Sequence, residues 1–241
     1  INGKFVDSTS DEVLDIVYPV TGEVIAQAPI STDDDVNTAM HAAQDAFKTW
    51  KHTTPSDRQL LLLKLADALE ENVDVLVEAQ HRNTGQPREL IRDEEVLVGA
   101  NQLRFFAGAA RTLEGKAATE YMEGHTSYVR REPIGVVAQV TPWNYPLMMA
   151  LWKLGPALAA GNTVVLKPSD TTPESTLELA RLIGEIYPAG VVNVVLGTGK
   201  TGEAMVGHPA PAMVSITGSV RAGQAVATGA AAGLKRSHLE L

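Results

Sequence analysis

The sequence contains no cysteine among its 241 residues. Disulfide bonds, thiolate metal sites and a cysteine nucleophile are therefore excluded within these residues. The 6 histidines are scattered along the chain, and no two of them have the spacing of a helical zinc motif. We therefore expect no metal site.

Long apolar runs and a surplus of positive charge are also missing. No stretch of about 18 or more apolar residues occurs, and the first residues lack the pattern of a secretory signal. The 20 lysines and arginines are outnumbered by 29 aspartates and glutamates, which gives a net charge of −9. This balance argues against a membrane or a nucleic acid as the main partner. A cytoplasmic protein is expected.

The two ends of the chain have unusual features. The sequence begins at Ile1 without a methionine, and it stops at Leu241 within an alternation of polar and apolar residues, 237–241, that is typical of a strand. We expect a fragment of a longer protein, cut before its second half.

The first 134 residues predict three regions of different character. Residues 1–30 alternate short apolar runs with turns, which predicts short antiparallel surface strands. Residues 31–120 have helical periodicity, and two of the long helices are expected over about 55–80 and 88–113. Residues 121–134 predict a β arm that would expose an edge and need a partner chain, so we expect an oligomerisation element there.

Residues 135–241 alternate strands with helices. The expected strands are Val136–Val140, Thr163–Lys167, Val191–Leu196, Met213–Thr217 and Ser237–Glu240, and the expected helices are Leu147–Ala160, Pro173–Ile186, Thr201–Val206 and Ala222–Ala231. This alternation predicts an α/β fold, a Rossmann-like doubly wound parallel sheet whose ligand crevice lies at the carboxyl ends of the strands. Residues 135–241 would then form a dinucleotide-binding core, and the sequence would stop at the last strand of this core, before the catalytic domain.

The turn after the first of these strands contains Trp143 and Asn144 between Pro142 and Pro146. The two prolines restrict the backbone of the residues between them. An asparagine held in this way can aim its side-chain NH2 at a ligand. The alternative is that the segment is only a tight turn, in which Asn144 is a polar residue without a binding role. The helix that follows is apolar except for Lys153, which should either snorkel to the surface or meet a polar cavity.

Two other strand ends carry candidate binding residues. The turn 167–170, Lys-Pro-Ser-Asp, could hold a ribose, or it could be an ordinary turn in which Asp170 or Thr171 caps the next helix. The turn from Gly218 to Gly223 could bring backbone N–H groups to a phosphate, although it is neither a P-loop nor a G-x-G-x-x-G motif. The run 197–201 ends like a P-loop, but Val194 stands at the first required glycine, which argues against a nucleotide-hydrolysing site.

Aromatic and acidic side chains offer weaker candidates. Tyr145 and Trp152 are two turns apart on one helix face and could enclose a cationic or aliphatic substrate, although packing in the core is the simpler interpretation. The acidic patch 93–95 is expected to be a solvated face, and a substrate-facing carboxylate is the minority interpretation.

Five motifs occur in one order along the chain. They are Thr141-Pro142-Trp143-Asn144, Lys-Leu-Gly-Pro-Ala-Leu-Ala-Ala-Gly-Asn (153–162), Leu-Lys-Pro-Ser-Asp (166–170), Thr-Gly-Ser (217–219) and Leu-Glu-Leu (239–241). In this order and spacing they resemble the aldehyde dehydrogenase superfamily, over essentially the whole chain. Residues 104–111 and 123–127 are most similar to γ-aminobutyraldehyde dehydrogenases, with betaine-aldehyde dehydrogenases as near neighbours.

The resemblance implies a reaction in which a cysteine thiolate attacks the aldehyde, hydride passes to a nicotinamide, and water hydrolyses the thioester. Asn144 would donate to the carbonyl oxygen, and Glu240 would activate the hydrolytic water. Lys153 would assist near the active site. The family's cysteine lies beyond the residue that matches Glu240, so these residues alone are predicted to be inactive.

The resemblance also implies NAD as the cofactor. Lys167, Ser169 and Asp170, with Pro168 in the same turn, would hold the adenosine ribose. Asp170 stands where the family usually has glutamate. Its carboxylate would repel the 2′-phosphate of NADP, although the shorter side chain and the Lys167–Ser169 pair leave NADP open. The other predicted cofactor residues are Thr141, Pro142, Trp143 and Asn144 at the nicotinamide end, and Gly199, Gly218, Ser219, Val220 and Gly223 near the adenosine or pyrophosphate.

The expected substrate is an ω-aminoaldehyde such as 4-aminobutanal, and betaine aldehyde is the alternative substrate. Tyr145, Trp152 and Glu95 are the candidates for contacting it. The protein is expected to form a homo-oligomer, a dimer or a tetramer. The competing hypothesis is a non-catalytic dinucleotide-binding or scaffold module that ends near Leu241.

Overall fold

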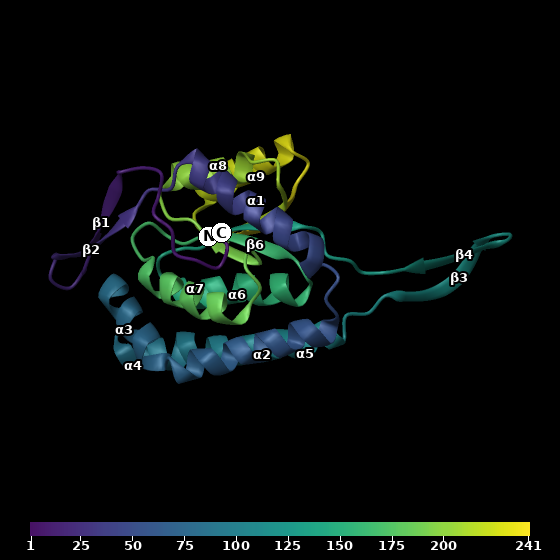
Figure 1. Cartoon of the computed structure of the whole chain (residues 1–241), viewed down its shortest axis with the longest axis horizontal. Coiled ribbons are helices and arrows are strands. Elements are labelled where there is room, and N and C mark those ends of the chain that lie inside the picture. The colour runs from purple at the N-terminus through teal and green to yellow at the C-terminus, as the bar shows by residue number, and fades with distance from the viewer.

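A five-stranded parallel sheet with the strand order β7-β6-β5-β8-β9 lies at the centre of the structure, a computed structural model that describes residues 1–241 (Figure 1). Its strands are β5 (Val136–Val140), β6 (Thr163–Lys167), β7 (Val192–Val194), β8 (Pro211–Thr217) and β9 (Arg236–Glu240). The winding starts at β5, runs outward through β6 and β7, and then returns to the other side of β5. The switch point between β5 and β8 is where doubly wound sheets bind ligands. The predicted α/β fold is confirmed.

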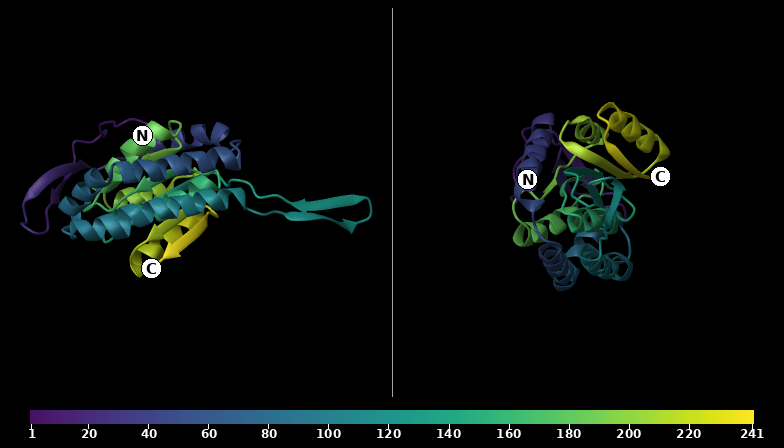
Figure 2. Two further views of the ribbon diagram at one scale, coloured as in Figure 1. Left: turned by 90° about the horizontal axis from the view of Figure 1, so that it is seen from below. Right: turned by 90° about the vertical axis from the view of Figure 1, so that its right-hand side faces the viewer.

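Helices cover both faces of this sheet (Figures 1 and 2). One face packs against α6 (Pro146–Ala159) and α7 (Glu174–Ile186), and the other packs against α1 (Asp33–Trp50), α8 (Gly199–Gly207) and α9 (Val220–Ala232). Strands β5 and β6 are mostly apolar and largely β-branched, as is typical of strands that are buried on both faces.

An outer layer of helices lies on α6 and α7. It consists of α2 (Pro55–Glu71), α3 (Val73–Thr84), α4 (Arg88–Ile91), the π-helical turn η1 (Arg92–Leu97) and α5 (Val98–Arg111). Two predicted helices are thus divided. The helix expected over 55–80 breaks at Asn72, whose backbone has φ −110° and ψ 22° and whose side-chain amide donates to the Ala68 carbonyl at 2.9 Å. The helix expected over 88–113 is interrupted by η1.

Two antiparallel hairpins extend from the layers. Strands β1 (Val13–Val17) and β2 (Val24–Pro29) form the short surface sheet expected in residues 1–30. Strands β3 (Lys116–Met122) and β4 (His125–Val129) form an arm that projects well away from the body (Figures 1 and 2). The arm begins at Lys116 rather than at Tyr121. At the base of the arm the two strands approach closely at Gly115, where a Cβ atom would lie 2.3 Å from the Val129 carbonyl oxygen.

No helix has both the length and the apolar character to cross a membrane.

Candidate active site at the carboxyl ends of the strands

The strand register brings distant parts of the chain to one edge of the sheet. Lys167 pairs with Val140, Val140 with Ile216, and Ile216 with Leu239, so these residues form one row across four strands. Since all the strands are parallel, the turns that follow this row gather at the same edge. Glu240 lies there beside β8: it pairs with Thr217, whose hydroxyl donates to the Glu240 carboxylate at 2.8 Å.

Lys153 lies on the buried side of α6, where its side chain meets the sheet. Its Nζ donates to Ser215 Oγ at 2.8 Å, and that oxygen lies 3.2 Å from His238 Nδ1. The backbone carbonyl of Lys153 accepts from Gln139 Nε2 at 2.8 Å. Burial lowers the pKa of Lys153 to about 8, and the negative charge of Glu240 opposes this shift. Lys153 therefore does not snorkel to the surface but is buried among polar groups of the sheet.

Sequence reasoning did not identify Gln139, Ser215 and His238 as members of this cluster. Gln139 and Ser215 are buried polar residues within otherwise apolar strands, which is the signal that could have marked them. Both pair in register, Gln139 with Ser215 and Ser215 with His238, so the cluster is one row of the sheet.

Asn144 combines an anchored backbone with a free side chain. Its carbonyl oxygen accepts a hydrogen bond from Gln86 Nε2 at 2.9 Å. Its side-chain amide is exposed and forms no hydrogen bond within the chain. The amide is therefore not used to hold its own turn together, and it is free to donate to a ligand. Beside it, Trp143 is 65% exposed, whereas the Thr141 hydroxyl is buried and has no hydrogen-bond partner.

The N-terminus of α6 is capped by side chains from other elements. Tyr145 stands at the cap position but makes no capping bond. Instead, Leu147 N donates to Gln80 Oε1 at 3.3 Å, and Met148 N donates to Glu95 Oε2 at 3.1 Å. Gln80 Nε2 also donates to Glu95 Oε1.

This arrangement corrects the sequence-based interpretation of Glu95. We expected its patch to be solvated or its carboxylate to meet a substrate ammonium group, but Glu95 is only 1% exposed. Its neighbours Asp93 and Glu94 are exposed as expected. Burial raises the pKa of Glu95 to about 7, although hydrogen bonds from Met148 N and Gln80 oppose the shift. Both carboxylate oxygens accept hydrogen bonds inside the protein, and the buried side chain is not accessible to a substrate.

The Lys167 ammonium group joins the turns after β6 and β7. Its Nζ donates to the carbonyl oxygens of Pro168 at 2.8 Å and Gly197 at 2.6 Å. Burial lowers its pKa to about 8, against the opposing charge of Asp170. Two of the three ammonium hydrogens are thus used, and one remains for a ligand.

The alternative interpretation of the turn 167–170 as a helix cap is not supported. Helix α7 begins at Glu174, and the Glu174 N–H donates to Asn83 Oδ1 at 2.8 Å rather than to Asp170 or Thr171. The Asp170 carboxylate is half-buried and accepts only from the Ser169 hydroxyl, at 3.3 Å. Asp170 therefore retains acceptor capacity at the edge of the sheet.

The predicted glycine positions differ in their surroundings. A Cβ atom at Gly199 would meet nothing within 4 Å, and one at Gly218 would only touch Ile216. At Gly223 a Cβ atom would lie 2.3 Å from Leu241 Cδ2. Gly223 thus lies against the Leu241 side chain, which would have to move to admit a larger residue. Between these glycines, Ser219 caps α9 by accepting from Ala222 N at 3.3 Å.

The aromatic rings predicted to face a substrate do not lie in the core. Tyr145 is 36% exposed and Trp152 is 42% exposed. Core packing, the simpler interpretation of these two rings, is therefore wrong. They remain available at the surface of α6.

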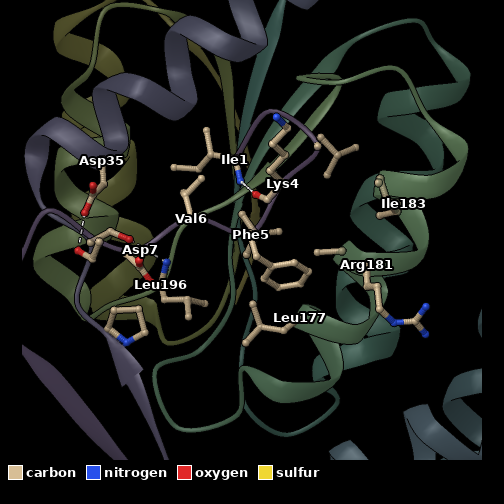
Figure 3. Close-up of a pocket in the computed structure, with 18 of the residues that line it drawn as sticks. Ile1, Lys4, Phe5, Val6, Asp7, Asp35, Leu177, Arg181, Ile183 and Leu196 are labelled. Carbon is tan, nitrogen blue, oxygen red and sulfur yellow. Dashed lines mark hydrogen bonds between the residues drawn. The ribbon is translucent and has the colours of Figure 1, made fainter.

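A cavity with a volume of about 930 Å³ lies elsewhere, between the N-terminal segment and α7 (Figure 3). Phe5, Leu177 and Arg181 are among its lining residues, and none of the predicted site residues lines it. The hydrogen-bonded polar groups converge instead at the strand ends.

Known proteins with similar sequences and structures share one description. Residues 5–241 match the Aldehyde dehydrogenase family. The chain is 40% identical over 242 residues to an acetaldehyde dehydrogenase of Pseudomonas aeruginosa, covering 100% of this chain and 48% of that protein.

Solved structures give the same result. PnpE from Pseudomonas sp. WBC-3 is 42% identical with a TM-score of 0.96, over 100% of this chain and 50% of that chain. PnpE has also been crystallised with nicotinamide adenine dinucleotide. A point mutant of betaine aldehyde dehydrogenase from Staphylococcus aureus, in complex with NAD+, is 34% identical with a TM-score of 0.96, again over 100% and 50%. The chain spans about half the length of these relatives.

Proposed function

The chain belongs to the aldehyde dehydrogenase family, and from this premise we propose that it binds NAD and takes part in the oxidation of an aldehyde to a carboxylate. The observation that carries the proposal is that the strand ends bring a free amide donor, Asn144, and a carboxylate, Glu240, to one edge of the sheet, with the buried Lys153 near enough to Glu240 to feel its charge. These groups match the three tasks of the reaction: binding the carbonyl oxygen, activating water and supplying positive charge.

The residues at this edge fit NAD. Asp170 has acceptor capacity for ribose hydroxyls, and Lys167 retains one donor. The first turn of α9 can receive the pyrophosphate at Val220, because a helix N-terminus presents unpaired N–H groups and positive potential. The partnerless Thr141 hydroxyl lies at the predicted nicotinamide end. When bound, NAD accepts the hydride that leaves the aldehyde carbon.

The chain's own residues would prepare both chemical steps. The Asn144 side-chain NH2 donates to the aldehyde oxygen and stabilises the negative charge that develops on it during attack. Glu240 removes a proton from the water that hydrolyses the thioester. The thiolate must come from outside these residues, since they contain no cysteine.

For the substrate we propose an ω-aminoaldehyde such as 4-aminobutanal. The exposed rings of Tyr145 and Trp152 support this proposal, because aromatic faces attract an ammonium group. Because Glu95 is buried, recognition of the amine would depend on these rings without a carboxylate. Betaine aldehyde carries a cation that the same rings could bind.

The test uses the full-length protein that contains this chain. NAD reduction is followed with 4-aminobutanal, betaine aldehyde and acetaldehyde, and each substrate is then repeated with NADP. We expect NAD-dependent activity with 4-aminobutanal as the preferred substrate. Absence of activity with every aldehyde would refute the proposed function, and a preference for NADP would refute the role of Asp170.

We also propose that the β3–β4 arm joins copies of the chain into a dimer or tetramer. Tyr121 and Tyr128 on the arm are 80% and 70% exposed, and both strand edges are unpaired. Replacing residues 116–129 with a short glycine-serine linker should reduce the mass measured by light scattering to that of a smaller species. An unchanged mass would contradict the role of the arm.

A cytoplasmic location remains a prediction that cell fractionation can test.

A further inference from the structure

We propose that Gln80, Gln86 and Glu95 are positioning residues, which fix Asn144 in place by anchoring both its backbone and the start of α6. The inference rests on the proposed function, because it gives Asn144 the task of binding the carbonyl oxygen. None of the three residues belongs to the five motifs that carry the family resemblance.

The first part of the network closes the N-terminus of α6. A helix leaves its first N–H groups without partners inside the helix. In α6 the first position is Pro146, which has no N–H, and the next two donors are bonded to Gln80 and Glu95. Each N–H group of the first turn is therefore held by a side chain that comes from α3 or η1.

The second part runs from Glu95 to the backbone of Asn144. Glu95 accepts from Gln80 Nε2, Gln80 Nε2 also donates to Gln86 Oε1 at 3.0 Å, and Gln86 Nε2 donates to the Asn144 carbonyl oxygen at 2.9 Å. The Gln80 amide thus uses its oxygen on α6 and both of its hydrogens within the network. Glu95 orients Gln80, Gln80 orients Gln86, and Gln86 holds Asn144.

The location of the network suits a positioning role. Gln80 and Glu95 are 0% and 1% exposed, so neither can touch a substrate. Glu95 lies on the π-helical turn η1, and such turns are common at functional sites. An oxyanion donor needs this kind of support, since a displacement of about 1 Å can cost roughly a hundredfold in rate.

The first test replaces Glu95 with glutamine in the full-length enzyme. A carboxylate accepts at both oxygens, whereas the amide of Glu95→Gln must turn its NH2 toward either Gln80 Nε2 or Met148 N, both of which are donors. We expect kcat to fall about tenfold, while KM for NAD stays within about twofold. Glu94→Gln is the matched control: Glu94 is adjacent and exposed, and this variant should retain wild-type kinetics.

A double-mutant cycle separates positioning from a general effect on folding. If Glu95 acts through Asn144, Glu95→Gln should lower kcat in the wild type but cause no further loss in the Asn144→Ala background. If the two losses multiply, or if Glu95→Gln leaves kcat unchanged, the inference is overturned.

A second variant covers the case in which Glu95→Gln does not fold. Gln86 is half-buried in a surface turn, and Gln86→Glu would place a carboxylate against the Asn144 carbonyl oxygen. We expect the same loss of kcat and the same absence of further loss with Asn144→Ala. Hydrogen exchange gives an activity-independent result: the Leu147 and Met148 amides should be protected in the wild type and should exchange faster in Glu95→Gln. If the wild type oxidises no aldehyde, the proposed function fails, and exchange alone decides whether the network holds α6.

Discussion

Two helices begin beside the switch point of the sheet, and the N–H groups of their first turns differ in how they are capped. At α6, which follows β5, the available first-turn donors are capped by side chains from other elements. At α9, which follows β8, Ser219 satisfies one N–H group, and Val220 in the first turn is 60% exposed. The closed terminus can serve as a rigid frame for Asn144, and the open terminus can receive an anionic ligand. The same helix end thus provides either a fixed support or a binding site, depending on what caps it.

The largest effect should come from removing the donor that the closed terminus supports. Asn144→Ala in the full-length enzyme should lower turnover by about two to three orders of magnitude, as the loss of an oxyanion donor does. Because the side chain makes no hydrogen bond within the chain, thermal stability should change little. Steady-state kinetics and a melting curve test both statements. A variant with normal turnover would refute the role of Asn144.

The second prediction closes the open terminus with a charge. Val220→Asp should raise KM for NAD about tenfold, because a carboxylate at the first position of α9 would repel the pyrophosphate. The same charge favours the helix dipole, so the melting temperature should not fall. Val220→Asn is the neutral control. Equal KM values for the Asp and Asn variants would show that charge at this terminus is not what binds the cofactor.

The contrast between the termini also shows what could be predicted from the sequence. Strands β5 and β6 have the predicted bounds because each is a short, β-branched run between turn residues. The break at Asn72 and the π-helical turn were missed. Apolar periodicity continues through both interruptions, so local patterns did not mark where packing divides the helices.

The candidate site was predictable only in part. The strand-end turns carry local signals, such as the prolines on either side of Asn144, and a Rossmann-like topology implies that these turns meet. Nothing local shows that Glu95 turns inward while Asp93 and Glu94 face solvent. That choice depends on η1 and on the α6 N-terminus about 50 residues later in the chain, so it is a tertiary property.

A third prediction uses the titration of Glu95 to examine the closed terminus. The carboxyl group titrates near 4.5 in the unfolded chain and at about 7 in the folded protein. Between these values the folded protein binds the additional proton, so the free energy of unfolding contributed by this group decreases as pH rises from about 4.5 to 7. The stability of the wild type relative to Glu95→Gln should therefore decline over this range, by roughly 3 kcal/mol, since each pKa unit corresponds to about 1.4 kcal/mol.

Urea unfolding at a series of pH values measures this difference. Glu94→Gln again serves as the control, and its stability relative to the wild type should show no comparable decline in that range. A flat difference curve for Glu95→Gln would mean that the pKa of this carboxyl group is not raised in the folded protein. Either the group is then better hydrated than the structure indicates, or the hydrogen bonds from Met148 N and Gln80 fully offset its burial.

The smallest effect concerns the exposed face of α6, which the closed terminus orients but does not cover. Trp152→Ala should lower kcat/KM for 4-aminobutanal about threefold relative to pentanal, a neutral aldehyde of similar size. An exposed ring contributes only about 0.5–1 kcal/mol to the binding of a cation. Using the ratio of two substrates cancels any change in Asn144 or in the cofactor site, because such a change would slow both reactions equally. An unchanged ratio would show that Trp152 does not recognise the amine, and it would leave the shape of the site, rather than its aromatic surface, to select the substrate.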